Sequence, residues 1–249
     1  TLHYLGKSEF DFGITLSSEL PIGKGMASSS ADIAAVCFAV AAAYANGTTV
    51  IKGAEMIQAG IVDAAIVGGI DMATDTVLIG FNALEAVSPD IINPFSKNRH
   101  GITLGDGAAF FVLSKDNLVE DGSAVMLAGY GESSDAYHMT SPSPDGDGAV
   151  LAMMNALCSV GITAQDIDYL NLHGTGTVFN DSMESKAVSK VFGDYKVPCS
   201  STKSQTGHTL GAAGALEAAV CYETIVRNYN CDKTVLPVQC WDGERDESL

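Results

Sequence analysis

Positive charge is scarce in this chain of 249 residues, which has 13 Lys and Arg residues against 30 Asp and Glu residues. The net charge of −17 repels a phosphate backbone over most of the surface, and this disfavours nucleic-acid binding. Long apolar runs are also lacking. The run from 33 to 45 is rich in Ala and shorter than the roughly 20 residues that a helix needs to span a bilayer, so no membrane span is expected.

Paired cysteines are missing as well. The six cysteines include no Cys-x-x-Cys pair and follow no regular spacing, so neither a disulfide framework nor a metal site is expected, and most should be reduced, buried thiols. The chain opens Thr-Leu-His-Tyr, without the basic start, apolar stretch and small-residue cleavage site of a secretion signal. These features predict a cytoplasmic protein.

Strands alternate with helices along most of the sequence, which predicts a layered α/β architecture. Helices are expected at 52–60, 149–160, 181–191 and 210–227, and strands at 10–20, 64–67, 108–113, 124–131, 167–172 and 197–201. The strand 64–67 is apolar on both faces, which is typical of the centre of a parallel or mixed sheet. The Gly-, Ser-, Pro- and Asp-rich loop 131–148 is long enough to cover a site.

Two histidines follow two of the predicted strands. The strand 167–172 leads into His173-Gly174-Thr175-Gly176-Thr177, and the strand 197–201 leads into Lys203-Ser204-Gln205-Thr206-Gly207-His208. Ligands in open α/β sheets usually bind beyond the carboxyl ends of the strands. We therefore expect both histidines in one site, where Lys203 anchors Glu184 and fixes the histidine geometry. The alternative is two unrelated histidines that cap core strands.

These two motifs resemble the β-ketoacyl synthases, the condensing enzymes of fatty-acid and polyketide synthesis, which have a thiolase-like fold. The resemblance covers about residues 47–237 and continues upstream of the histidines in 53–60, 66–71, 80–84, 94–101, 104–109 and 130–138. It implies a thiolase-like layered α/β sandwich, which we expect to be incomplete at both ends. The predicted domains are a segment 1–46 and a partial synthase-like domain 47–249.

The resemblance implies a decarboxylative Claisen condensation. His173 and His208, as neutral imidazoles, would donate hydrogen bonds to the malonyl thioester oxygen, and Lys203 with Glu184 would position them. The substrate-binding residues would be Thr175, Thr177 and Thr206. No permanently bound cofactor is implied, because the phosphopantetheine arm of an acyl carrier protein carries the substrate. The implied partners are this carrier protein and a second synthase subunit, in a homodimer or a heterodimer.

The nucleophilic cysteine of that family has no counterpart at the expected offset, near Ala43 and Tyr44. Cys37 lies about six residues too early by this count, and Cys199 is interpreted as a packing residue. Without an acyl-enzyme, full condensation should be weak or absent. Malonyl decarboxylation, which depends chiefly on the two histidines, should survive. The alternative function is that of a non-catalytic partner subunit of a synthase.

The first 45 residues resemble a different family. The segment 20–35 is similar to the phosphate loop of the small-molecule kinases that include the homoserine, mevalonate and L-threonine kinases. Backbone N–H groups and hydroxyls at a helix N-terminus can hold phosphates, which makes Gly23, Gly25, Ser28 and Ser29 candidate phosphate-binding residues. The alternative is a Gly-Ser loop that caps a core helix. An ATP-dependent kinase fragment is therefore a third hypothesis.

Overall fold

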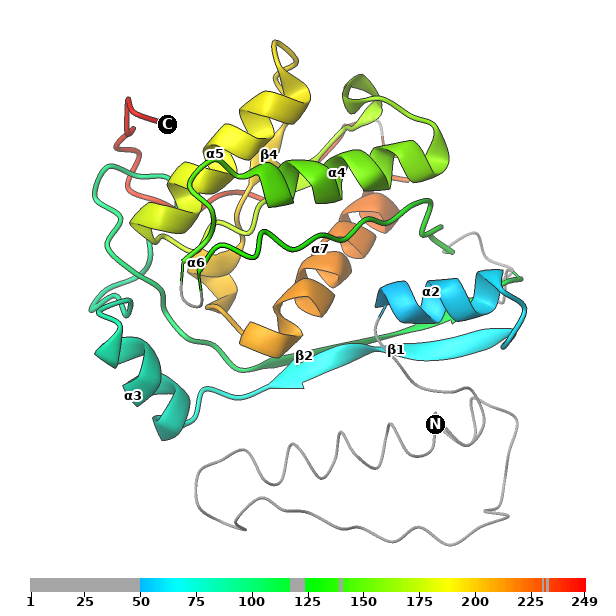
Figure 1. The fold of residues 1–249 in the computed structure, drawn as a ribbon, viewed down its shortest axis with the longest axis horizontal. Coiled ribbons are helices and arrows are strands. Elements are labelled where there is room, and N and C mark those ends of the chain that lie inside the picture. Colours follow the sequence, from blue (N-terminus) through cyan, green and yellow to red (C-terminus); the bar gives the residue numbers. More distant parts are fainter. Residues whose placement is uncertain (1–49, 117–123, 139–140, 230, 232) are drawn as a thin grey trace, which may run out of the picture. The chain divides into compact units, whose positions relative to one another are not determined.

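The computed structural model describes residues 50–116, 124–138, 141–229, 231 and 233–249 (Figure 1). The predicted strand 10–20, the candidate phosphate loop with Gly23, Gly25, Ser28 and Ser29, and Cys37 lie outside the described residues. The predicted boundary at 46/47 also lies outside them and stays a prediction. The described chain divides into two compact units, one formed by 50–80, 106–116 and 209–219 and the other by Phe81–Gly105, Val125–His208 and Val220–Leu249.

The first unit is built on an antiparallel pair of strands. In it β1 (Ala64–Asp71) pairs antiparallel with β2 (Gly107–Ser114), from Ala64↔Ser114 to Asp71↔Gly107. Helix α2 (Val50–Gln58) lies along β1 (Figure 1). The prediction of a central strand in a parallel or mixed sheet is wrong for the described residues, where β2 is the one partner of β1. Only one face of this pair is well covered, because Ala65 and Val67 are buried whereas Phe110 is exposed.

The covered face of β1 meets the turn η2 (Leu210–Ala212) and the start of α7 (Ala213–Asn228). Gly69 permits this contact, since a Cβ at this position would lie 2.6 Å from the carbonyl oxygen of Gly211. Asp71 accepts a hydrogen bond of 2.9 Å from the backbone N–H of Gly211. Helix α3 (Asp75–Ala83), which the sequence patterns did not reveal, follows β1.

The second unit contains a helical layer and a short parallel sheet. Helices α4 (Asp147–Val160) and α5 (Val178–Phe192) pack on each other, and the turn η1 (Ala164–Asp166) adds to the apolar cluster beneath them. The buried members of this cluster are Leu157, Ala164, Phe192 and Val197. Strands β3 (Leu170–Asn171) and β4 (Cys199–Ser200) pair in parallel, and α6 (Lys203–Thr206) follows β4.

The segment 124–131 was predicted as a strand, and this prediction is wrong. Its described residues run beside α4 without pairing to a strand. The backbone lies so close to the helix that a Cβ at Gly131 would be 2.2 Å from the carbonyl oxygen of Ala152. The backbone N–H of Tyr130 donates to Ser159 Oγ at 3.3 Å. The glycines therefore bring this segment against a helix surface instead of a neighbouring strand.

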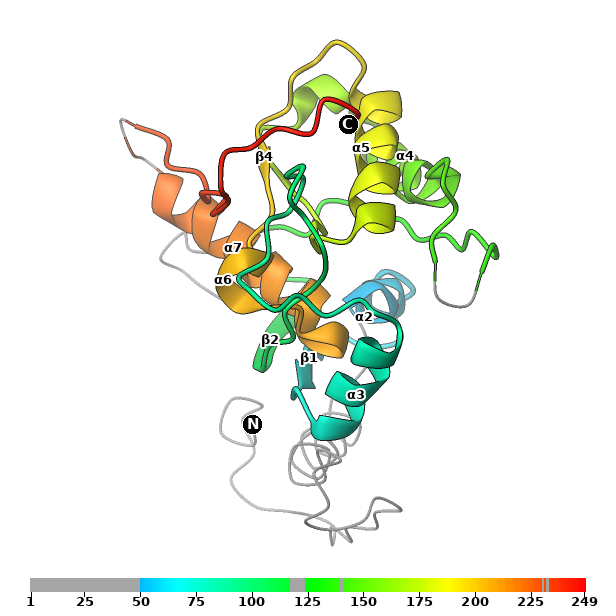
Figure 2. The ribbon, with the colours of Figure 1, turned by 90° about the vertical axis from the view of Figure 1, so that its left-hand side faces the viewer.

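The end of the chain returns to the parallel strands. Figure 2 shows the C-terminal segment passing beside β4 and ending near α5. Ser200 Oγ donates to the carbonyl oxygen of Pro237 at 2.8 Å, and the backbone N–H of Ser201 donates to Gln239 at 3.1 Å. Among the described helices, none is long and apolar enough to cross a bilayer.

Candidate active site

The parallel pairing of β3 and β4 brings the two predicted motifs together. The backbone N–H of Leu172 donates to the carbonyl oxygen of Ser200 at 2.9 Å, so the segments after β3 and β4 leave the sheet side by side. His173 lies in the segment after β3, and Lys203 lies in the segment after β4, at the start of α6. The expectation of one site beyond the carboxyl ends of the strands thus matches the arrangement of these segments.

The two imidazole rings lie against each other. The ring centroids of His173 and His208 are 5.1 Å apart, and the ring planes are nearly perpendicular, at 86°. The backbone of His208 is fixed separately, because its N–H donates to the carbonyl oxygen of Thr103 at 2.7 Å and its own carbonyl accepts from Gly105 at 3.1 Å. The two rings therefore come from distant segments and meet at one point.

Lys203 determines which nitrogen of His173 carries the proton. Its side chain is 2% exposed, and its Nζ lies 3.2 Å from Nδ1 of His173 and 2.6 Å from the carbonyl oxygen of the same residue. An ammonium group has donors and no acceptor, so Nδ1 must accept. The neutral ring consequently carries its proton on Nε2.

The protonation state of His173 follows from its surroundings. The residue keeps an exposed side, but burial of the ring lowers its pKa to about 3, with further lowering by the charge of Lys203 and by His208. Protonation of this ring would place a second positive charge beside the ammonium group. A lowered pKa favours the neutral form of His173 near pH 7, which is the form that the resemblance implies.

Glu184 holds the backbone of the turn that carries His173. Its Oε1 accepts from the N–H of His173 at 2.6 Å, and its Oε2 accepts from the N–H of Gly174 at 2.8 Å. Burial raises the pKa of Glu184, whereas these hydrogen bonds and the charge of Lys203 lower it. The carboxylate fixes the main chain of His173, and the ammonium group of Lys203 fixes the ring.

The three predicted substrate-binding threonines differ in accessibility. Thr175 is buried, and its hydroxyl lies 2.9 Å from that of Thr177. Thr177 is the N-cap of α5 and accepts from the backbone N–H of Asn180 at 3.4 Å. Thr206 is exposed and donates to the carbonyl oxygen of Gly207 at 2.9 Å. Contacts of these threonines with a substrate stay a prediction.

Asp181 is a site residue that sequence reasoning missed. The residue is fully buried, and its two oxygens accept from the backbone N–H groups of Phe95, at 2.8 Å, and Gly176, at 3.2 Å. Burial raises its pKa, and the hydrogen bonds and the nearby Arg99 oppose this. Its position in the first turn of a helix behind a Gly-rich turn was the available signal. Asp181 keeps the turn 174–177 in place.

The cysteines depart from the expectation of burial. Cys221 is half-buried, and the other described cysteines, Cys158, Cys199, Cys231 and Cys240, are exposed. Cys199 was interpreted as a packing residue, but the short β4 leaves its thiol on the wall of a cavity. Burial and the charge of Glu184 raise the pKa of this thiol, which disfavours the thiolate that a nucleophile requires.

The sequence matches the family profiles described as "Beta-ketoacyl synthase, N-terminal domain", over residues 21–118, and "Beta-ketoacyl synthase, C-terminal domain", over residues 124–230. The chain belongs to the β-ketoacyl synthase family. It is 40% identical over 212 residues to 3-oxoacyl-[acyl-carrier-protein] synthase 2 of Coxiella burnetii, a match that covers 80% of this chain and 51% of that protein.

Two solved synthase structures resemble this one. A ketosynthase in complex with its chain length factor, from Xenorhabdus doucetiae, is 43% identical with a TM-score of 0.72, and the match covers 80% of this chain and 48% of that one. A solved complex of a type II polyketide synthase acyl-carrier protein with its ketosynthase contains a chain that is 30% identical to this one, with a TM-score of 0.65. The match covers 70% of this chain and 46% of that one.

These comparisons confirm the predicted family and the partial α/β fold of thiolase-like type. The chain spans about half the length of the synthases that it matches. The profile for the N-terminal domain begins at residue 21 and so includes the residues that resemble a kinase phosphate loop. None of these matches addresses the kinase resemblance, which stays a prediction.

Proposed function

We propose that this synthase-family chain decarboxylates a malonyl thioester on an acyl carrier protein, which is the step of β-ketoacyl synthesis that its two histidines can support. The observation that carries the proposal is the hydrogen bond between Lys203 and Nδ1 of His173. This bond places a proton on Nε2 of a neutral ring, at the atom left to face a substrate. A donor of this kind can stabilise an oxyanion.

The step balances without a cofactor. The bond between the malonyl carboxylate and the adjacent carbon breaks, carbon dioxide leaves, and the electron pair forms the enolate of the acetyl thioester. His173 and His208 donate hydrogen bonds to the thioester oxygen on which this negative charge develops. Each donor contributes about 3 kcal/mol to the transition state. When no acyl chain is present, water protonates the enolate carbon and acetyl-carrier protein forms.

Full condensation requires a thiolate that accepts an acyl chain. The raised pKa of Cys199 does not favour that role, and Cys37 lies outside the described residues. We therefore propose that decarboxylation exceeds condensation in this chain. The phosphopantetheine arm of the carrier protein would deliver the malonyl group, and Thr175, Thr177 and Thr206 are the residues proposed to lie along it.

The proposed partners are an acyl carrier protein and a second synthase subunit. A similar ketosynthase was solved with its acyl-carrier protein and another with its chain length factor, which supports both proposals. The net charge of −17 opposes docking of an acidic carrier protein over most of the surface. Lys186 and Lys190 on α5 are the lysines proposed for local docking, and their contribution should weaken as salt increases. It should also be small, because Lys190 forms an ion pair with Asp147 at 2.6 Å and Lys186 donates to the carbonyl oxygen of Pro144.

The test is incubation of the full chain with malonyl-carrier protein, with carbon dioxide release and acetyl-carrier protein both measured. We expect release that falls at least about 100-fold in the double variant His173→Ala, His208→Ala. His100→Ala is the matched control, because His100 is exposed and bonds to Ser88 and the carbonyl oxygen of Asn98 instead of the pair.

Each outcome decides between the hypotheses. Release that is unchanged in the double variant overturns the roles of the two histidines. A folded chain that shows no release alone, but copurifies with an intact synthase, favours the non-catalytic partner subunit. Circular dichroism of every variant separates loss of chemistry from loss of fold.

A further inference from the structure

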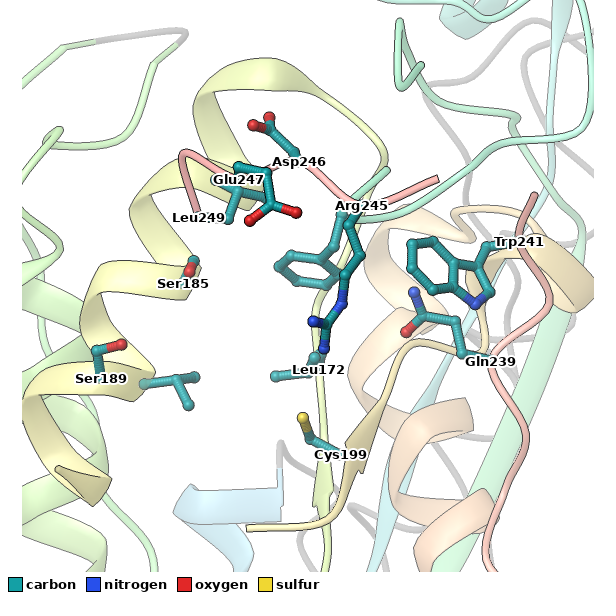
Figure 3. Close-up of a pocket in the computed structure, with 12 residues that line it drawn as sticks. Leu172, Ser185, Ser189, Cys199, Gln239, Trp241, Arg245, Asp246, Glu247 and Leu249 are labelled. Atoms are coloured by element: carbon teal, nitrogen blue, oxygen red, sulfur yellow. The ribbon is translucent and has the colours of Figure 1, made fainter. Parts of the chain in front are cut away.

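A cavity lies in the second unit, and Leu172, the residue before His173, is part of its wall. Its volume is about 430 Å³, and neither histidine of the pair lines it (Figure 3). The walls come from α5, from the ends of β3 and β4, from the loop at Phe95 and from the C-terminal segment. The lining residues from the two strands and the C-terminal segment are Leu172, Cys199, Gln239, Trp241, Arg245, Asp246, Glu247 and Leu249. A volume of this size suits a small organic ligand.

The C-terminal wall is held in place by alternate residues. Asp242 accepts from Ser96 Oγ at 3.1 Å, Glu244 forms an ion pair with Lys97, and Asp246 pairs with Arg99. Trp241, Arg245, Asp246 and Glu247 of this stretch line the cavity.

Arg245 is the cation of this cavity. Figure 3 shows its side chain extending from the C-terminal segment into the space between the walls. Its backbone bridges to Ser96, but its guanidinium group has no hydrogen bond or ion pair within the described part of the chain. The negative charge of the neighbouring Asp246 is already engaged by Arg99 and Ser248. An unpaired guanidinium group offers a planar donor set that matches a carboxylate.

Most of the remaining lining is apolar or carries hydroxyls, and Glu247 adds a carboxylate. Phe95, Leu172, Val188 and Trp241 supply apolar and aromatic surface. The hydroxyls of Ser185 and Ser189 line the opposite wall, on α5, and make no side-chain hydrogen bond among the described residues. Gln239, in contrast, uses its amide on Ser201 and on the carbonyl oxygen of Pro94. The cavity thus offers the cation of Arg245, the carboxylate of Glu247 and an apolar wall.

We propose that this cavity binds a small monocarboxylate with an apolar body, whose carboxylate pairs with Arg245 and whose hydrocarbon lies against Leu172, Val188 and Trp241. Glu247 also lines the cavity, and its negative charge disfavours a second carboxylate on the ligand. A dicarboxylate should therefore bind more weakly than a monocarboxylate. The site is independent of the proposed decarboxylation, since it involves none of the residues assigned to that step.

The sequence provides a reporter for the test, because Trp241 is the only tryptophan of the chain. Octanoate is the probe, and 1-octanol is its uncharged counterpart. We expect octanoate to change the Trp241 emission along a saturable curve, with about tenfold weaker binding in Arg245→Gln, which corresponds to roughly 1.4 kcal/mol. Arg227→Gln is the matched control, since Arg227 pairs with Glu223 and does not line the cavity.

A second measurement does not depend on fluorescence. Alkylation of Cys199 by iodoacetamide, followed by mass spectrometry, should slow when octanoate is bound, whereas the exposed Cys158 serves as the internal reference. Equal octanoate binding by the wild-type chain and Arg245→Gln overturns the proposal, and so does equal binding of octanoate and 1-octanol. Unprotected Cys199 at saturating octanoate also overturns it, because the ligand would then lie elsewhere.

Discussion

The Nζ atom of Lys203 lies between Nδ1 of His173, at 3.2 Å, and the carbonyl oxygen of that same residue, at 2.6 Å. One buried ammonium group therefore sets the ring tautomer and the main-chain orientation of His173 together. Because Lys203 does not need to touch a substrate to do this, it acts as a positioning residue. Its removal should affect the state of the imidazole as well as the reaction.

Lys203→Met tests this positioning role. We expect decarboxylation to fall about 100-fold, because the Nε2 donor is no longer held in place. We also expect the pKa of His173 to rise, since the charge of Lys203 lowers it in the wild-type chain. Nitrogen NMR of the imidazole should show a mixture of tautomers. A variant that keeps the single tautomer would contradict the assignment, and Lys52→Met, on the exposed face of α2, is the control for loss of a lysine.

Acid should charge His173 only at low pH. The pKa of this residue in the folded protein, about 3, lies below its ordinary value of 6.5, so the unfolded chain binds the proton first. The contribution of His173 to stability is therefore complete above pH 6.5 and is lost as the pH falls toward 3. The measurement is the NMR titration of His173, which should show no midpoint between pH 5 and 8. A midpoint near 6.5 would argue against the buried, lysine-bonded ring.

Glu184→Gln should loosen the turn at His173. Each carboxylate oxygen of Glu184 accepts from one backbone N–H, whereas an amide has a single oxygen and turns its NH₂ group toward the other donor. One unsatisfied donor costs about 1–3 kcal/mol, which chemical denaturation can measure. Decarboxylation should fall as well. Glu223→Gln, on the exposed part of α7, should change neither quantity.

Asp181→Asn should weaken the fold around the Gly-rich turn. The two oxygens of Asp181 accept from Phe95 and Gly176, and replacement by an amide leaves one of these donors opposite another donor. We expect a loss of about 1–3 kcal/mol in the free energy of unfolding. The exposed Asp116→Asn provides the comparison. Equal stability of the two variants would show that Asp181 does not hold the turn.

Local patterns revealed the helices and the ends of the two short strands better than they revealed pairing. Helix 149–160 was predicted from its apolar residues, and α4 covers Asp147–Val160. The apolar segment 124–131 has equally strong strand propensity, but Gly129 and Gly131 place it against α4, and no local rule expresses that contact. Strand propensity depends on the partner that the chain meets.

The sequence predicted the histidines and the lysine of the site, but it did not predict the residues that hold the surrounding backbone in place. The motifs at His173 and Lys203 predicted that these side chains meet His208 in one place, and the structure brings the three together. The roles of Asp181 and Arg99 depend on contacts with Phe95 and Asp246, which lie far away along the sequence. The acidic C-terminal segment gave no sign of a partner, since Glu244 and Asp246 form ion pairs with Lys97 and Arg99, which lie about 147 positions earlier.

The brevity of the β3–β4 ladder has a consequence for how the molecule forms. Only two residue pairs join these strands, and the segment of chain that connects them contains the whole of α5. Closing such a loop costs entropy before any contact repays it. The imidazoles should consequently reach their common location late in folding. Unfolding of the second unit, which contains both strands and both histidines, should therefore abolish decarboxylation.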